Sequence, residues 1–127
     1  MVDLSFFNIE ENEKTEKNKS KNNDSFNQTS NIDEELKEKL KKYKSLTSKA
    51  LKKIRLNYSL SLKEKKIAQD FIGMADAYFK DAKYFEKQKD LLTALAAFSY
   101  AHAWLDAGVR AGLLDAQGDD TLFVLKD

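Results

Sequence analysis

The chain has 127 residues and a formal net charge of +1, with no cysteine, no proline and a single histidine. This length suits one domain. The absence of cysteine excludes a disulfide framework and thiolate metal sites, and one histidine argues against structural zinc. No apolar run approaches the ~18 residues of a spanning helix. The opening stretch carries its charges on the wrong side of its apolar residues for a signal peptide. We therefore expect a soluble, cytoplasmic protein with no cofactor, metal or membrane partner.

The charge is unevenly distributed along the chain. Residues 1–31 carry a net charge of −2, residues 32–66 a net charge of +7, and residues 67–127 a net charge of −4. Such segregation favours electrostatic complementarity between packed helices. It is also compatible with a basic footprint for nucleic acid.

The N-terminal region predicts no packed structure. Residues 12–31 are rich in Lys, Asn, Ser and Glu, and such a segment buries too little apolar surface to offset chain entropy. The preceding "LSFFNI" (4–9) is a small apolar island, and the sequence leaves open whether it docks to anything. We therefore expect a disordered tail over residues 1–31 and a folded domain over residues 32–127.

Two amphipathic helices are predicted next. The first begins near Asn31 or Asp33, because Asn31 and Glu34 have capping-box spacing, and Ser61 with Glu64 repeats that signal for the second. Lysines fill the outer faces of the first helix. The apolar positions recur every three or four residues. They are Leu36, Leu40, Tyr43, Thr47, Ala50, Ile54 and Tyr58 in the first helix, and Ile67, Phe71, Met74, Tyr78, Ala82 and Phe85 in the second.

A third helix is predicted from Leu91 to about Leu113, capped by Asp90. It is apolar nearly all round, which is typical of a buried helix, so we expect it at the centre of the bundle. One face is a stripe of Leu91, Leu95, Phe98, His102, Leu105, Val109 and Gly112, and a second face holds Ala96, Tyr100, Ala103, Ala107 and Ala111.

The segments combine into one predicted architecture. We expect an all-α antiparallel three-helix bundle, made of a long helical hairpin and a basic first helix, with a disordered N-terminal tail. The C-terminal "TLFVL" (121–125) is predicted to be a short extended segment that packs back onto the bundle or pairs with a neighbour.

Residues 75–115 resemble a known family. The resemblance is to the small archaeal helical family catalogued as domain of unknown function 357. The matching residues are Ala75, Tyr78, Asp81, Ala82, Phe85 and Asp90, and then the run from Tyr100 to Gly108 apart from Ala103. Lys89 and Ala103 stand where that family has glycine. The resemblance implies a helical fold and no assigned activity. If the turn at Lys89 needs a positive φ, this lysine is strained.

Ser99, His102 and Asp106 suggest a hydrolytic triad, but a nucleophilic serine needs a strained turn and free backbone N–H groups, which mid-helix residues lack. We therefore predict no catalytic residue. "DAQGDD" (115–120) lacks the spacing of a calcium loop. His102 is interpreted as a core histidine hydrogen-bonded to Asp81 or Asp106.

The favoured function is a non-catalytic adaptor or assembly domain, with another protein or a second copy of the chain as partner. Its surface is predicted on the third helix and the C-terminal segment. The alternative is nucleic-acid binding without sequence preference through the first helix. The candidate partner-binding or structural residues are Asp81, Tyr100, His102, Trp104, Asp106 and Arg110, and the candidate nucleic-acid contacts are Lys41, Lys42, Lys49, Lys52 and Lys53.

Overall fold

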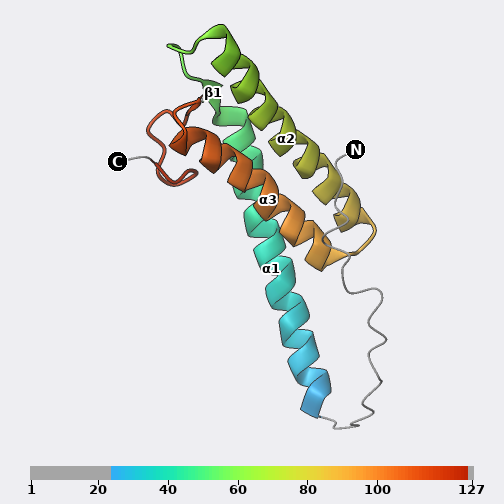
Figure 1. Cartoon of the computed structure of the whole chain (residues 1–127). Helices are drawn as coiled ribbons and strands as arrows, with labels where there is room; N and C mark the ends of the chain where they lie inside the picture. Colours follow the sequence, from blue (N-terminus) through green and yellow to red (C-terminus); the bar gives the residue numbers. More distant parts are fainter. Residues whose placement is uncertain (1–23, 126–127) are drawn as a thin grey trace.

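The computed structural model describes residues 24–125, with side chains from residue 31 onwards. Three helices, α1 (Asp24–Lys53), α2 (Leu62–Lys87) and α3 (Leu91–Arg110), run up, down and up (Figure 1). The hairpin of α2 and α3 packs along its whole length, whereas α1 contacts mainly α3 and touches α2 only sparingly. The predicted three-helix bundle with a central third helix is therefore confirmed.

The start of α1 differs from the prediction. The helix begins at Asp24, so Asn31 lies inside it and is not its cap. Residues 31–35 are exposed, and their helix is an extension of the packed part. Extending an existing helix gains one hydrogen bond for each residue that is fixed. The low helix propensity of polar residues opposes this extension only weakly. The helix therefore starts seven residues before Asn31, and the tail predicted for residues 1–23 lies outside the described residues.

The caps of α2 and α3 are as predicted. The Glu64 backbone N–H donates to the Ser61 hydroxyl, and the Ser61 N–H donates back to the Glu64 carboxylate. Hydrogen bonding to the Glu64 carboxylate, first by the Ser61 side chain and then by the Ser61 backbone N–H, holds the pKa of Glu64 below its ordinary value. Asp90 accepts a hydrogen bond from the Thr93 N–H at the start of α3.

Both hairpin helices end in the same motif. After α3, the Leu113 N–H bonds to the Gly108 carbonyl, and Gly112 has a φ of 76°. After α2, the Asp90 N–H bonds to the Phe85 carbonyl, and Lys89 has a φ of 62°. These are Schellman ends, in which glycine is the usual left-handed residue. The expected strain at Lys89 is confirmed, and α3 stops three residues before the predicted Leu113 because Gly112 closes it.

A short two-stranded ladder closes one end of the bundle. Strand β1 (Arg55–Leu56) follows α1 and pairs antiparallel with β2 (Leu114–Asp115), which follows α3. The ladder holds the ends of two helices that are far apart in sequence. Tyr58, expected on the apolar stripe of the first helix, lies beyond α1 and is 94% exposed. The link after Lys53 turns into the ladder and carries Tyr58 away from the core.

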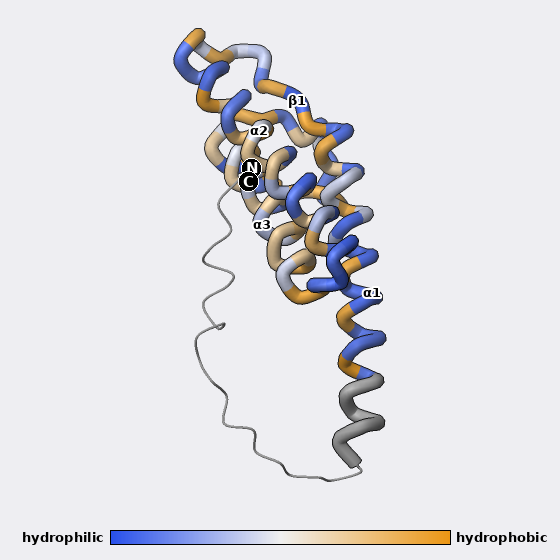
Figure 2. The backbone as a smooth tube through the Cα atoms, turned by 90° about the vertical axis from the view of Figure 1, so that its right-hand side faces the viewer, coloured by the Kyte–Doolittle hydropathy of each residue, from blue (hydrophilic) through white to orange (hydrophobic). Residues whose placement is uncertain are grey.

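The core consists of two clusters joined by Trp104. One cluster lies towards the ladder, around Ile54, Leu105 and Leu114, and the other lies towards the α2–α3 turn, around Leu40 and Phe98. Figure 2 shows α3 in the pale and orange tones of apolar residues, whereas α1 alternates between orange and blue. Alanines at buried positions of α3 bring its backbone close to both neighbours.

Candidate interaction surfaces

His102 joins three parts of the fold. Its Nε2 lies 2.6 Å from the carbonyl oxygen of Leu122, and its Nδ1 lies 3.2 Å from the hydroxyl of Thr47 on α1. A carbonyl only accepts, so Nε2 carries a proton and donates it. Thr47 is fully buried and also lies 3.4 Å from the carbonyl oxygen of Phe98. The side chain of His102 is 17% exposed, and it links α1, α3 and the C-terminal segment.

The partners of His102 differ from those predicted. Its hydrogen bonds go to Thr47 and Leu122 rather than to Asp81 or Asp106. Asp106 lies 3.8 Å from Nε2, which is ion-pair range but beyond a hydrogen bond. Instead, Asp106 accepts from the backbone N–H of Val124 at 3.0 Å. The C-terminal segment thus supplies the partners of both side chains, Leu122 for His102 and Val124 for Asp106.

Ser99, His102 and Asp106 are not arranged as a hydrolytic triad. The Ser99 hydroxyl donates to the Leu95 carbonyl of its own helix at 3.0 Å, and both ring nitrogens of His102 are engaged elsewhere. Ser99, His102 and Asp106 line a shallow depression of about 210 Å³, yet they form no relay from hydroxyl to base to carboxylate.

The C-terminal segment packs back onto the bundle, as predicted, but residues 120–123 form turns and a bend rather than the expected extended segment. Phe123 is 4% exposed, and its ring centre lies 6.2 Å from that of His102. Asp119 anchors the start of the segment. Hydrogen bonds from the Thr121 hydroxyl and from Lys53, whose Nζ is 2.9 Å away, hold the pKa of Asp119 far below its ordinary value. The segment therefore covers the His102 and Asp106 side of α3.

The other face of α3 stays open. Tyr100 is 38% exposed, and Ala103, Ala107 and Ala111 are exposed as well. Tyr100, Ala103 and Ala107 surround a depression of about 230 Å³ together with Trp104. We call the residues Ala96, Tyr100, Ala103, Trp104, Ala107 and Ala111 the outer strip.

Trp104 belongs to both the core and the outer strip. Its ring packs edge-on against Phe71 of α2 at 5.1 Å and faces Tyr100 at 6.4 Å. Its indole Nε1 is buried and has no hydrogen-bond partner among the described residues. The indole is therefore held by packing, and its position is fixed without polar contacts. Arg110 is exposed at the end of the same helix.

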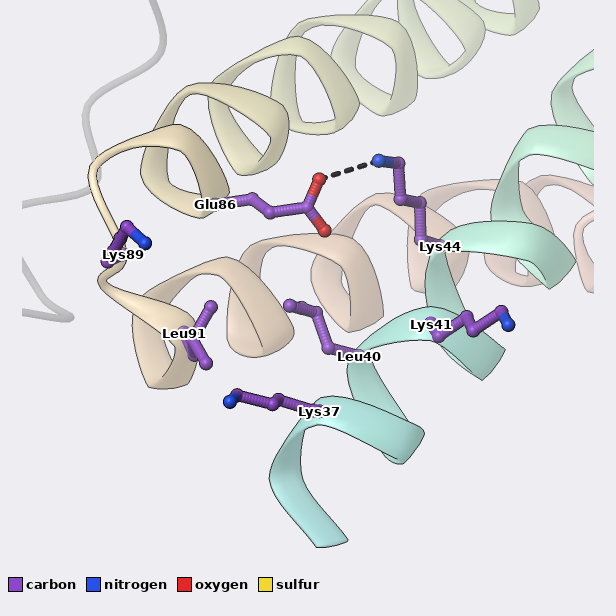
Figure 3. Close-up of a pocket in the computed structure, with 7 residues that line it drawn as sticks. All are labelled: Lys37, Leu40, Lys41, Lys44, Glu86, Lys89 and Leu91. Atoms are coloured by element: carbon purple, nitrogen blue, oxygen red, sulfur yellow. Dashed lines mark hydrogen bonds and ion pairs between the residues drawn. The ribbon is translucent and has the colours of Figure 1, made fainter. Parts of the chain in front are cut away.

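A second surface lies between α1 and the turn that joins α2 to α3. A depression of about 440 Å³ is lined by Lys37, Leu40, Lys41 and Lys44 of α1 and by Glu86, Lys89 and Leu91, and Figure 3 shows the Lys41 side chain extending away from the last three. A neighbouring depression of about 390 Å³ shares Lys41 and Lys44 and adds Ser45, Ser48, Phe79 and Lys83. We call these two neighbouring depressions together the lysine groove, and its lysines are Lys37, Lys41, Lys44, Lys83 and Lys89.

The lysines predicted to contact nucleic acid are not all equivalent. Lys41, Lys42, Lys49 and Lys52 are all exposed, but Lys41 lines the lysine groove and the other three do not. Lys53 is half-buried and engaged by Asp119. The sequence prediction missed Lys83 and Lys89 because it considered the first helix alone. In the sequence these two lysines lie on either side of the end of α2. Their place beside α1 is apparent only in the folded hairpin.

Within residues 24–125, no group of three or more His, Cys, Asp or Glu side chains is placed to hold a metal ion. No helix in that described range is long and apolar enough to cross a membrane.

The architecture defines a small all-α domain in which the basic helix α1 packs against the hairpin of α2 and α3. Residues 42–114, more than half of the chain, match the family described as "Protein of unknown function (DUF357)", and the chain belongs to that family. The match covers the hairpin, the second half of α1 and β1, and ends at Leu114. No curated protein and no solved structure matches the chain.

Proposed function

We propose that this protein is a non-catalytic assembly domain, and that two copies pair through the outer strip of α3. The observation that carries the proposal is the exposure of this apolar face along a helix that is otherwise the centre of the core. Contiguous exposed apolar surface on a small domain marks an interaction site. Aromatic residues are favoured at the centres of such interfaces.

A second copy fits this surface because the strip is complementary to itself. In an antiparallel pairing of two α3 helices about a two-fold axis, Ala103 faces Trp104 of the other copy and Ala107 faces Tyr100. Ala96 then faces Ala111. Each large ring thus meets a small residue, which is the knob-and-hole relationship of close helix packing.

The size of the strip sets the expected affinity. Since α3 has 20 residues, it is about 30 Å long at 1.5 Å per residue. One helix face of that length belongs to the small interfaces, below about 1,200 Å² in total. We therefore expect a dissociation constant in the micromolar range, on the order of 10 μM to 1 mM.

The first test is the molar mass of the full chain by light scattering over that concentration range. We expect a dimer that dissociates on dilution. The variant Ala107→Glu places a charge in the strip and should be monomeric, whereas Gln69→Glu, an equal charge change on the exposed face of α2, should dimerise normally. A full chain that stays monomeric at the highest concentration and binds no hydrophobic dye would contradict the proposal.

Cross-linking tests the geometry. Because the chain has no cysteine, a single introduced thiol reports only its own contacts. Ala103→Cys lies next to the proposed two-fold axis and should form a disulfide-linked dimer on mild oxidation. Gln69→Cys serves as the exposed control and should remain monomeric. Equal cross-linking of both variants would mean random collision and would overturn the proposed pairing.

A further inference from the structure

The lysine groove owes its existence to the way the helices pack. Both α1 and α2 contact α3 extensively but barely contact each other, and two depressions lie between them, with the Lys44–Glu86 ion pair spanning the gap. Leu40 of α1 and Leu91 of α3 form the groove's apolar lining at one end, and Phe79 of α2 does so at the other. Figure 3 shows Leu40 pointing across to Leu91, with Lys37 and Lys89 on either side. The result is a recess with an apolar base and a cationic rim.

The rim carries a large local excess of positive charge. Among the described residues that line the groove, Glu86 is the single acid against five lysines. Lys44 pairs with Glu86 at 2.6 Å. Lys37, Lys41, Lys83 and Lys89 make no ion pair with the described part of the chain, and Lys83 lies 5.1 Å from the centre of the Phe79 ring. The whole chain has a net charge of only +1, so this local excess is not a consequence of its overall charge.

The spacing of the lysines is regular. Lys37, Lys41 and Lys44 lie on successive turns of α1, so their Cα atoms are separated along the axis by about 4.5 to 6 Å. Such a row suits a chain of evenly spaced negative charges better than one isolated anion. The hydroxyls of Ser45 and Ser48 follow in the same groove and add hydrogen-bond donors.

Lys89 adds an independent observation. It occupies the left-handed position of a Schellman end, where its side chain raises the energy of the turn. Strained residues of this kind concentrate at functional sites. Here the strain places a cation on the side of the groove opposite Lys37 and Lys41 (Figure 3).

We propose that the lysine groove binds the phosphate backbone of single-stranded nucleic acid. The lysines and serines contact successive phosphates, while Leu40, Leu91 and the Phe79 edge give sugars and bases an apolar surface. A recess between two helices admits one strand, whereas a duplex is too wide to reach its base. The proposal is independent of the assembly function, because the outer strip and the lysine groove share no residue.

The test is fluorescence anisotropy of the full chain with a labelled oligothymidine of about 20 nucleotides, in salt from roughly 50 to 200 mM. Lys41→Gln with Lys89→Gln removes two charges from the groove. Lys49→Gln with Lys52→Gln removes two charges from exposed positions on the same α1. We expect micromolar binding by the natural chain, about tenfold weaker binding by the groove variant, and a salt slope reduced by about 1.4. The control variant should bind nearly normally.

Three outcomes would overturn the proposal. The first is no binding at the lowest salt, and the second is an equal loss of affinity in both double variants, which would show that only total charge matters. The third is equal or tighter binding of a labelled poly-glutamate chain, which would identify an acidic protein as the better ligand. Circular dichroism of each variant confirms that the fold is intact, and Ala107→Glu should leave oligonucleotide binding unchanged.

Discussion

His102 on α3 lies 3.2 Å from the hydroxyl of Thr47 on α1, although 55 positions separate the two residues in the chain. The same ring donates from Nε2 to the Leu122 carbonyl, so one side chain connects the first helix, the central helix and the C-terminal segment. Thr47 is fully buried, and besides the longer contact with the Phe98 carbonyl at 3.4 Å, the His102 ring is the nearer hydrogen-bond partner of its hydroxyl.

Replacing His102 should destabilise the fold. His102→Ala leaves the Leu122 carbonyl and the Thr47 hydroxyl without this partner, so we expect the free energy of unfolding to fall by about 1–3 kcal/mol. Urea denaturation measures this loss. Ser99→Ala is the control on the same helix, because the Ser99 hydroxyl bonds only to Leu95. An unchanged melting midpoint for His102→Ala would show that the histidine is not a structural element.

The pair itself is measured by a double-mutant cycle. Thr47→Val keeps the volume of the side chain and removes the hydroxyl that faces Nδ1. If the two residues stabilise the fold together, the double variant should lose less stability than the sum of the single variants, by about 0.5–3 kcal/mol. Simple additivity would mean that the contact carries no energy of its own.

Two glycines predict opposite effects of the same substitution. A Cβ at Gly108 would lie 2.7 Å from Cγ of Leu114, which is buried, whereas a Cβ at Gly73 would meet nothing within 4 Å. We expect Gly108→Ala to lower the stability by about 1–3 kcal/mol through overpacking. Gly73→Ala, in the exposed middle of α2, should raise it by about 0.5–1 kcal/mol. Thermal denaturation of both variants checks the pair, and two changes of the same sign would contradict it.

The features that the sequence predicts correctly are local ones. The caps at Ser61 and Asp90 depend on residues three positions away, so spacing alone identifies them. The central place of α3 follows from its nearly continuous apolar surface. The start of α1 was missed because seven residues with weak helix preference still extend a helix that is already formed.

The features that could not be predicted join distant segments. The partners of His102 come from α1 and from the C-terminal segment, and the ladder pairs Arg55 with Asp115. The lysine groove likewise needs Lys41 from α1 beside Lys89 from the turn. Each depends on how the helices cross, which the residue pattern of a single helix does not contain.

Acid should weaken the attachment of the C-terminal segment. Hydrogen bonds from Thr121 and from Lys53 lower the pKa of Asp119 in the folded protein. Its carboxylate therefore stabilises the fold fully above its unfolded pKa of about 3.9, and this contribution is lost as the pH falls towards the lower folded pKa. Between about pH 6 and pH 3, Asp119→Asn should lose less stability than the natural chain. Urea denaturation at both pH values measures this, with Asp120→Asn, an exposed neighbour, as control. Parallel losses in all three proteins would contradict the prediction.

Lys89→Gly should make the protein more stable and a weaker binder of single strands. A lysine at a φ of 62° is strained, whereas glycine adopts this conformation freely. The relief exceeds the added entropy of glycine in the unfolded chain, so we expect a gain of about 0.4–1 kcal/mol in the free energy of unfolding. Gln88→Gly is the matched control, because Gln88 has an ordinary helical φ of −77° and the variant should lose stability.

The same Lys89→Gly protein loses one cation from the lysine groove, so its affinity for oligothymidine should fall although its fold is more stable. Denaturation and anisotropy on one sample decide both points. A Lys89→Gly protein less stable than the natural chain would show that the turn is not strained, and unchanged affinity would remove Lys89 from the groove's binding residues.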